Sequence, residues 1–170
     1  MAALRRRFPV ALAFLEEAAR RGEDGGMVRS VLGRTCPPPR PGWLDGLSED
    51  ALATRARARG RFTRNFVIQA SAADWANALV AGLRLRLRTL TASIEQGRRG
   101  QEPGPGHERG PGPDLVFFQH DEVIVHTPAD LADDVVVAVR EAGAHATRLV
   151  LPEPVPIPLA ATVAGSYDKP

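Results

Sequence analysis

The chain has 170 residues, of which 22 are basic, 20 are acidic and 44% are apolar, and this length suits one ordinary domain with its own core. The single cysteine, Cys36, permits no intrachain disulfide and favours a reducing compartment. No run of about 18 apolar residues could cross a membrane, and the basic start of the chain lacks the apolar stretch of a secretory signal. We therefore expect a cytoplasmic protein, neither disordered nor stapled by disulfides, with no membrane partner.

Pro9 suits the first position of a helix, Gly22 suits its end, and the apolar side chains between them repeat at helical spacing. Residues 27–32 then predict a short strand that ends at Gly33. The prolines that follow exclude regular structure across residues 36–42.

Two helices are predicted in the middle of the chain. Ser48 is a good N-cap for a helix over residues 49–59. Ser71 opens a second helix, because Ser71-Ala-Ala-Asp74 has the form of a capping box. One face of this second helix is apolar and consists of Ala72, Ala76, Leu79, Leu83, Leu87 and Leu90.

Residues 97–113 contain six glycines and four prolines and are predicted to form a flexible surface loop. Two short apolar runs, 115–118 and 123–125, flank a polar tip and predict a β-hairpin. Residues 129–142 predict a helix, and the proline-rich tail predicts an edge strand. The order of these elements predicts an α+β fold in which an antiparallel sheet packs against long helices.

The net charge of +2 conceals a segregation along the chain. Residues 1–100 carry a balance of +9, with arginine as their only basic residue, and residues 101–170 carry a balance of −7. A protein that held nucleic acid near metal-binding carboxylates would show such a pattern. A dipolar surface that merely maintains solubility is the alternative, and charge alone favours it.

The tip of the predicted hairpin, Gln119-His120-Asp121-Glu122, is the most informative segment. Mg²⁺ prefers one or two carboxylates completed by water and substrate phosphates, and a rigid hairpin would hold such a carboxylate accurately. Because neighbouring strand residues point to opposite faces, Asp121 and Glu122 would not bind one ion equally. A plain polar turn is the alternative, and composition alone favours it.

Histidines close to the tip raise a further possibility. His126 lies six residues after His120, so a metal-dependent hydrolase centred on His120, Asp121 and His126 is a weaker alternative. The histidine spacing matches no zinc pattern and Cys36 has no nearby thiol partner in the sequence, so a zinc site is rejected.

A second polar cluster precedes the second predicted helix. It consists of Arg55, Arg57, Arg59, Arg61, Arg64, Asn65 and Gln69. Arginine, asparagine and glutamine suit the sugar–phosphate backbone and the minor-groove acceptors of duplex DNA. A solvated helix face explains Arg55, Arg57 and Arg59 well. It explains Asn65 and Gln69 poorly, because these amides stand in an otherwise apolar approach to a helix and would need partners.

Three segments of the chain occur in a recognisable order. Residues 25–34 read Gly-Gly-Met-Val-Arg-Ser-Val-Leu-Gly-Arg, and residues 61–74 have the spacing Arg-x-x-x-Asn-x-x-x-Gln followed by Ala-Ser-Ala-Ala-Asp. Residues 115–126 carry His-Asp-Glu between two apolar runs. Together these segments resemble family A DNA polymerases, the DNA polymerase I family, across residues 5–168. The pattern is most similar to the actinobacterial type with a proofreading-exonuclease-like domain. Where the family has Gly-Thr, this chain has Ala-Ser.

The resemblance implies that residues 1–170 are the C-terminal part of a polymerase domain, with a palm-type antiparallel sheet. Asp121 matches the carboxylate of the family's motif C that binds the catalytic Mg²⁺ ions, and Glu122 matches its less stringent neighbour. His120 matches a residue near the primer terminus. Contacts to the minor groove of primer–template DNA are matched by Arg61, Asn65 and Gln69.

The family also needs an aspartate in motif A and a fingers helix that grips the nucleotide. Neither Asp-x-Ser-x-x-Glu nor Arg-x-x-x-Lys-x-x-x-Phe occurs in this sequence, and both would precede Met1. Two-metal phosphoryl transfer needs carboxylates from both motifs, so we expect the chain to bind Mg²⁺ weakly and not to polymerise alone.

The implied partners are primer–template DNA, a deoxynucleoside triphosphate in the complete enzyme, and an N-terminal polymerase half. That half would cover one side of the sheet, so exposed apolar area is expected there. A non-catalytic DNA-binding module is the alternative from another functional class.

Overall fold

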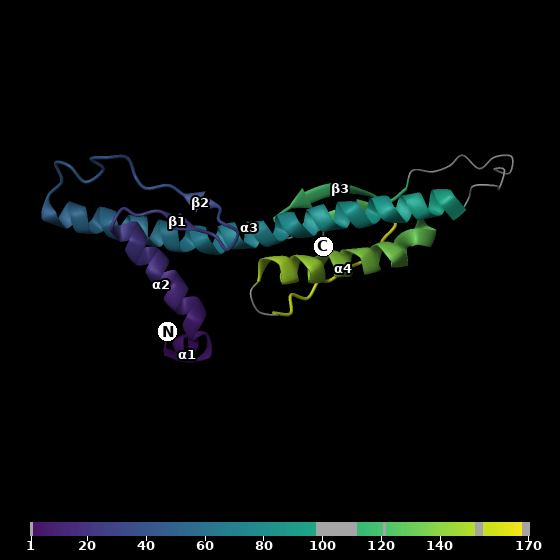
Figure 1. Ribbon diagram of the computed structural model, residues 1–170, viewed down its shortest axis with the longest axis horizontal. Helices are drawn as coiled ribbons and strands as arrows, with labels where there is room; N and C mark the ends of the chain where they lie inside the picture. Colours follow the sequence, from purple (N-terminus) through teal and green to yellow (C-terminus); the bar gives the residue numbers. More distant parts are fainter. Residues whose placement is uncertain (1, 98–111, 121, 152–154, 168–170) are drawn as a thin grey trace. The chain divides into compact units, whose positions relative to one another are not determined.

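The protein is described by a computed structural model that has an α+β architecture, with long helices and two small antiparallel sheets (Figure 1). The described residues are 2–97, 112–120, 122–151 and 155–167. Most of the predicted loop at 97–113 therefore lies outside them. The chain divides into two compact units, Met1–Asp74 and Trp75–Pro170.

The first unit begins with two helices, α1 (Ala2–Arg7) and α2 (Pro9–Glu23). Pro9 occupies the start of α2, as predicted, because its missing N–H is not needed in the first turn. The predicted apolar stripe is only partly buried: Ala18 is 4% exposed whereas Val10 is 82% exposed. Helix α1 was not predicted from the sequence.

A short hairpin follows, in which β1 (Val28–Arg29) pairs antiparallel with β2 (Thr35–Cys36). The predicted strand at 27–32 is thus shorter than expected, because residues 30–34 form the turn between the two strands. The segment after β2 has no helix or strand until residue 49, in agreement with its prolines.

Helix α3 (Glu49–Gly97) is continuous, so the prediction of two separate helices is wrong. Ser71 and Asp74 have the sequence pattern of a capping box but do not cap a helix start. Their side chains form hydrogen bonds with residues of the 30–34 turn. In the first unit α3 packs closely on α2. The Thr63 hydroxyl donates to the carbonyl oxygen of Ala18 at 2.8 Å, and Gly22 leaves the space that Thr63 fills. The buried apolar residues of this unit's core are Ala18, Val28, Cys36 and Val67.

The second unit contains the predicted hairpin, with β3 (Asp114–Gln119) antiparallel to β4 (Glu122–His126). A bulge interrupts the register, because Leu115 pairs with Val125 and Phe117 pairs with Ile124. After a short 3-10 helix, η1 (Ala129–Leu131), helix α4 (Ala132–Val150) extends beyond the predicted end at 142.

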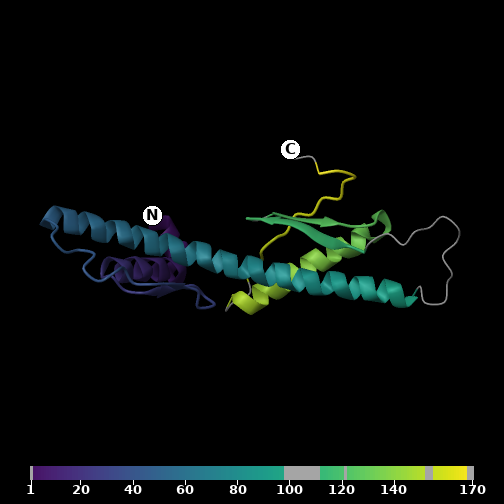
Figure 2. The same ribbon diagram turned by 90° about the horizontal axis from the view of Figure 1, so that it is seen from above.

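Helix α4 runs alongside the second part of α3 (Figures 1 and 2). Of the apolar face predicted for α3, Leu79, Leu83 and Leu87 are buried there, whereas Ala72 is exposed. The buried residues that α4 contributes are Val135, Ala138, Ala142 and Ala146. One face of the hairpin packs on this core through Leu115, Val123 and Val125. On β3, Val116 is 58% exposed and Phe118 is 42% exposed, so apolar side chains lie at the surface of the hairpin.

Residues 155–167 of the tail form no strand, so the predicted edge strand is wrong for this described part. The prolines cannot donate to a sheet, and the side chain of Leu159 packs on the core beside Gly143 instead. Among the described residues, no helix combines the length and apolarity that a membrane span requires.

Candidate functional site

The connection at the hairpin tip is shorter than the predicted four-residue polar segment, because Gln119 and Glu122 belong to the strands. Gln119 pairs with Glu122, so the turn consists of two residues. His120 has a φ of 53°, in the left-handed region that two-residue hairpin turns require at their first position. Asp121, on which the metal prediction chiefly rests, lies outside the described residues, and its role stays a prediction.

Glu122 begins β4 and is exposed to solvent. The Tyr167 hydroxyl donates a hydrogen bond to its Oε1 atom at 2.9 Å. The hydrogen bond to Glu122 raises the pKa of the Tyr167 phenol, and slight burial and the negative charge of the carboxylate act in the same direction. Sequence reasoning missed Tyr167, because no local pattern signals a contact between residues 45 positions apart.

The structure separates the two histidines of the hydrolase hypothesis. His120 lies in the turn, whereas His126 pairs with Asp114 at the other end of the hairpin. At about 3.3 Å per strand residue, the four steps from Glu122 to His126 span roughly 13 Å, so His120 and His126 cannot ligate one ion. Within the described part of the chain, no three metal-ligating side chains gather.

Arg61, Asn65 and Gln69 share one exposed face of α3, because successive steps of four residues return to nearly the same side of a helix. Thr63 and Val67 lie on the opposite, buried side. The interpretation that a solvated helix face explains Asn65 and Gln69 poorly is therefore wrong, because both amides are exposed to solvent. None of the three side chains forms a hydrogen bond or ion pair with any described residue, which leaves their polar atoms accessible to an external acceptor. This stripe belongs to the first unit and the hairpin tip belongs to the second.

Arg59 differs from the other arginines of the cluster. It is half-buried, and its Nη2 atom donates to the Pro37 carbonyl and to Cys36 Sγ. Its guanidinium also lies over the Phe62 ring, 5.3 Å from the centroid. The interpretation of Arg59 as a solvated side chain is therefore wrong, because it fixes the start of the proline-rich segment on α3.

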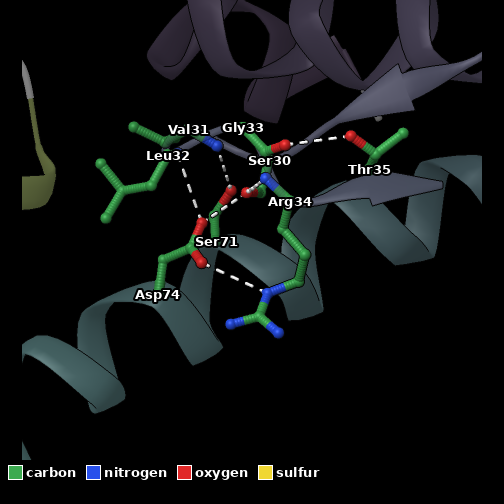
Figure 3. A network of polar contacts seen from close by, with 8 residues as sticks. All are labelled: Ser30, Val31, Leu32, Gly33, Arg34, Thr35, Ser71 and Asp74. Atoms are coloured by element: carbon green, nitrogen blue, oxygen red, sulfur yellow. Dashed lines mark hydrogen bonds and ion pairs between the residues drawn. The ribbon is translucent and has the colours of Figure 1, made fainter.

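A buried polar network links the 30–34 turn to α3 (Figure 3). Asp74 is 6% exposed and accepts hydrogen bonds from the Ser30 hydroxyl and from the Leu32 N–H, the latter at 3.3 Å. Arg34 Nε donates to the other carboxylate oxygen at 3.3 Å. One turn earlier on α3, Ser71 Oγ accepts from the Val31 N–H.

Burial alone would raise the pKa of Asp74, but the bonds from Ser30, Leu32 and Arg34 outweigh it and hold the pKa below its usual value. Both of its oxygens are engaged by the protein. Such a carboxylate is a structural anchor, because it has no proton to give at neutral pH and holds partners on both oxygens.

Comparison with protein-family models found no match, and comparison with curated proteins found none. The function is therefore inferred from the residues and their geometry.

Proposed function

We propose that the chain is the C-terminal, palm-type portion of a family A DNA polymerase and contributes to template-directed nucleotidyl transfer. The observation that carries the proposal is the hairpin at residues 114–126. The segment resembling motif C adopts a two-residue turn between antiparallel strands, with His120 left-handed and Glu122 exposed at the start of β4. This geometry presents the tip to a large substrate.

The exposed stripe on α3 supports the same proposal. Arg61, Asn65 and Gln69 offer donors at four-residue intervals on one helix face. Minor-groove acceptors are nearly uniform among base pairs, so such donors can detect correct pair geometry without reading sequence. By the resemblance to motif C, His120 would separately contact the DNA near the primer terminus.

The donor set at the tip fits Mg²⁺, because carboxylate oxygens are the ligands that this hard cation prefers. Bound Mg²⁺ would supply Lewis-acid activation of a phosphoryl group and a fixed geometry for its transfer. In this chain, Asp121 and Glu122 would hold the ion. The Glu122 Oε1 atom is engaged by Tyr167, and Oε2 accepts no hydrogen bond from the described residues.

Binding of the full chain to a fluorescent primer–template duplex tests whether the stripe formed by Arg61, Asn65 and Gln69 contacts DNA. Gln69→Ala and Asn65→Ala should each weaken binding roughly two- to tenfold, the size of one lost hydrogen bond. Gln96→Ala is the matched control, because Gln96 is an exposed amide near the end of the same helix and does not continue the four-residue spacing of the stripe. An equal loss in the control, or no loss in either stripe variant, would contradict the assignment.

A non-catalytic DNA-binding module is the second candidate, and one observation favours it: the stripe needs no metal ion to donate hydrogen bonds. Asp121→Ala distinguishes the two candidates in an enzyme reassembled with a half that supplies motif A and the fingers helix. The polymerase proposal predicts loss of primer extension with retained duplex binding. Full extension by the Asp121→Ala variant would leave only the binding module.

A further inference from the structure

The C-terminal tail contacts the hairpin tip at the carboxylate that the proposed function assigns to the metal site. Tyr167 is the only tyrosine in the chain, and its hydroxyl donates to Glu122 Oε1 at 2.9 Å. Tyr167 is 54% exposed and Glu122 is also exposed, so the contact lies at the surface where an ion would bind.

The tail is anchored before it reaches the tip. Leu159 packs on the α3–α4 core, and a Cβ placed on Gly143 would lie 2.4 Å from its Cδ1 atom. Figures 1 and 2 show the tail, in yellow, continuing from this region beyond α4. Tyr167 is therefore carried by a segment that is fixed at residue 159, rather than by a free chain end.

The contact has a consequence for the carboxylate. A glutamate side chain loses rotamer freedom when it binds an ion, and a hydrogen bond to one oxygen removes part of that freedom beforehand. Tyr167 occupies Oε1, whereas Oε2 receives no hydrogen bond from the described part of the chain. A carboxylate with one free oxygen suits Mg²⁺, which takes few protein oxygens and retains several waters.

We propose that Tyr167 is a positioning residue for Glu122, holding the carboxylate with Oε2 available to a divalent cation. Tyr167 acts through Glu122 and contacts neither ion nor substrate. This inference rests on the proposed function, because it takes Glu122 as a metal ligand.

The proposal is tested by measuring the affinity of the full chain for Mn²⁺. The electron paramagnetic resonance signal of the unbound ion reports how much Mn²⁺ remains free. Tyr167→Phe removes only the hydroxyl and should weaken Mn²⁺ binding about tenfold, as expected when the partner of a metal-binding carboxylate is lost. Glu122→Gln should weaken Mn²⁺ binding at least as much. The double variant, Tyr167→Phe with Glu122→Gln, should bind Mn²⁺ no more weakly than Glu122→Gln alone. Glu141→Gln, which removes the same charge from an exposed site on α4, should leave binding unchanged.

The outcomes separate the two levels of the proposal. If Glu122→Gln weakens binding and Tyr167→Phe does not, the positioning role is overturned while the metal site stands. Tighter binding by Tyr167→Phe would also overturn it, since the hydroxyl would then compete with the ion. If Glu122→Gln has no effect, Glu122 is not a ligand and the inference fails while Asp121 can still hold the ion. If the unaltered chain binds no Mn²⁺, both the metal site and the inference fail.

Discussion

The carboxylates of Asp74 and Glu122 differ in burial and in the number of their hydrogen-bond partners, and these differences indicate different roles. Asp74 is buried and engaged on both oxygens by residues of the 30–34 turn. Glu122 is exposed and engaged on one oxygen by Tyr167. Sequence alone suggested Glu122 as a site residue from its neighbours, but it could not reveal either set of partners, because these contacts join residues at least 40 positions apart.

Asp74→Asn should lower the free energy of unfolding of the first unit by about 1–3 kcal/mol, because it leaves buried donors without their charged acceptor. The effect should depend on pH. The folded protein holds the pKa of Asp74 below its usual value, so its stabilising effect is complete above about pH 5 and is lost as the pH falls through the folded-state pKa.

Urea unfolding measures this effect. Trp43 lies in the first unit, so its fluorescence in a Trp75→Phe background reports on that unit. The stability difference between Asp74 and its asparagine variant should shrink below about pH 4. A difference that stays constant with pH would show that the ionised carboxylate is not what holds the turn.

At the scale of elements, short-range patterns predicted the start of α2 and the strands of the β3–β4 hairpin. Pro9 and the polar tip act locally, so their effects are visible in the sequence. The continuity of α3 was not predictable in this way, because Ser71 and Asp74 carry a helix-start pattern but use their side chains across the fold. The bulge between Leu115 and Phe117 likewise depends on pairing with β4.

Ala72→Pro distinguishes a continuous α3 from a helix that starts at Ser71. Proline is tolerated at the first position of a helix but costs about 3 kcal/mol in its interior. Ala72 is exposed, so packing should not contribute. The variant should lose about 3 kcal/mol of stability, whereas Glu49→Pro, at the start of α3, should lose little. Equal stability of the two variants in urea unfolding would contradict the continuous helix.

For the whole molecule, the uneven distribution of charge along the chain bears on the proposed DNA contacts. Residues 1–100 have a balance of +9 and residues 101–170 a balance of −7. The stripe residue Arg61 makes no ion pair with the described residues, whereas Arg59 is used to hold the fold. Sequence counts gave both arginines equal weight, and only their contacts separate a structural group from one available to DNA.

Duplex binding should weaken with salt, because each neutralised phosphate releases counterions and contributes about −0.9 to the slope of log K against log salt. Arg61→Ala removes one positive charge from the stripe, so it should reduce the magnitude of that slope by up to about one. Arg140→Ala removes an exposed arginine from the acidic half of the chain and should leave the slope of log K against log salt unchanged. A salt-independent affinity would exclude the basic half as the DNA-binding surface.

The proposal that the chain is part of a family A polymerase is tested most directly by reading the DNA immediately upstream of the Met1 codon in all three frames. The proposal predicts an encoded Asp-x-Ser-x-x-Glu segment and a helix with the pattern Arg-x-x-x-Lys-x-x-x-Phe, which would supply the second carboxylate and the nucleotide grip. Upstream DNA that encodes neither pattern would contradict the proposal and leave DNA binding without catalysis as the function to pursue.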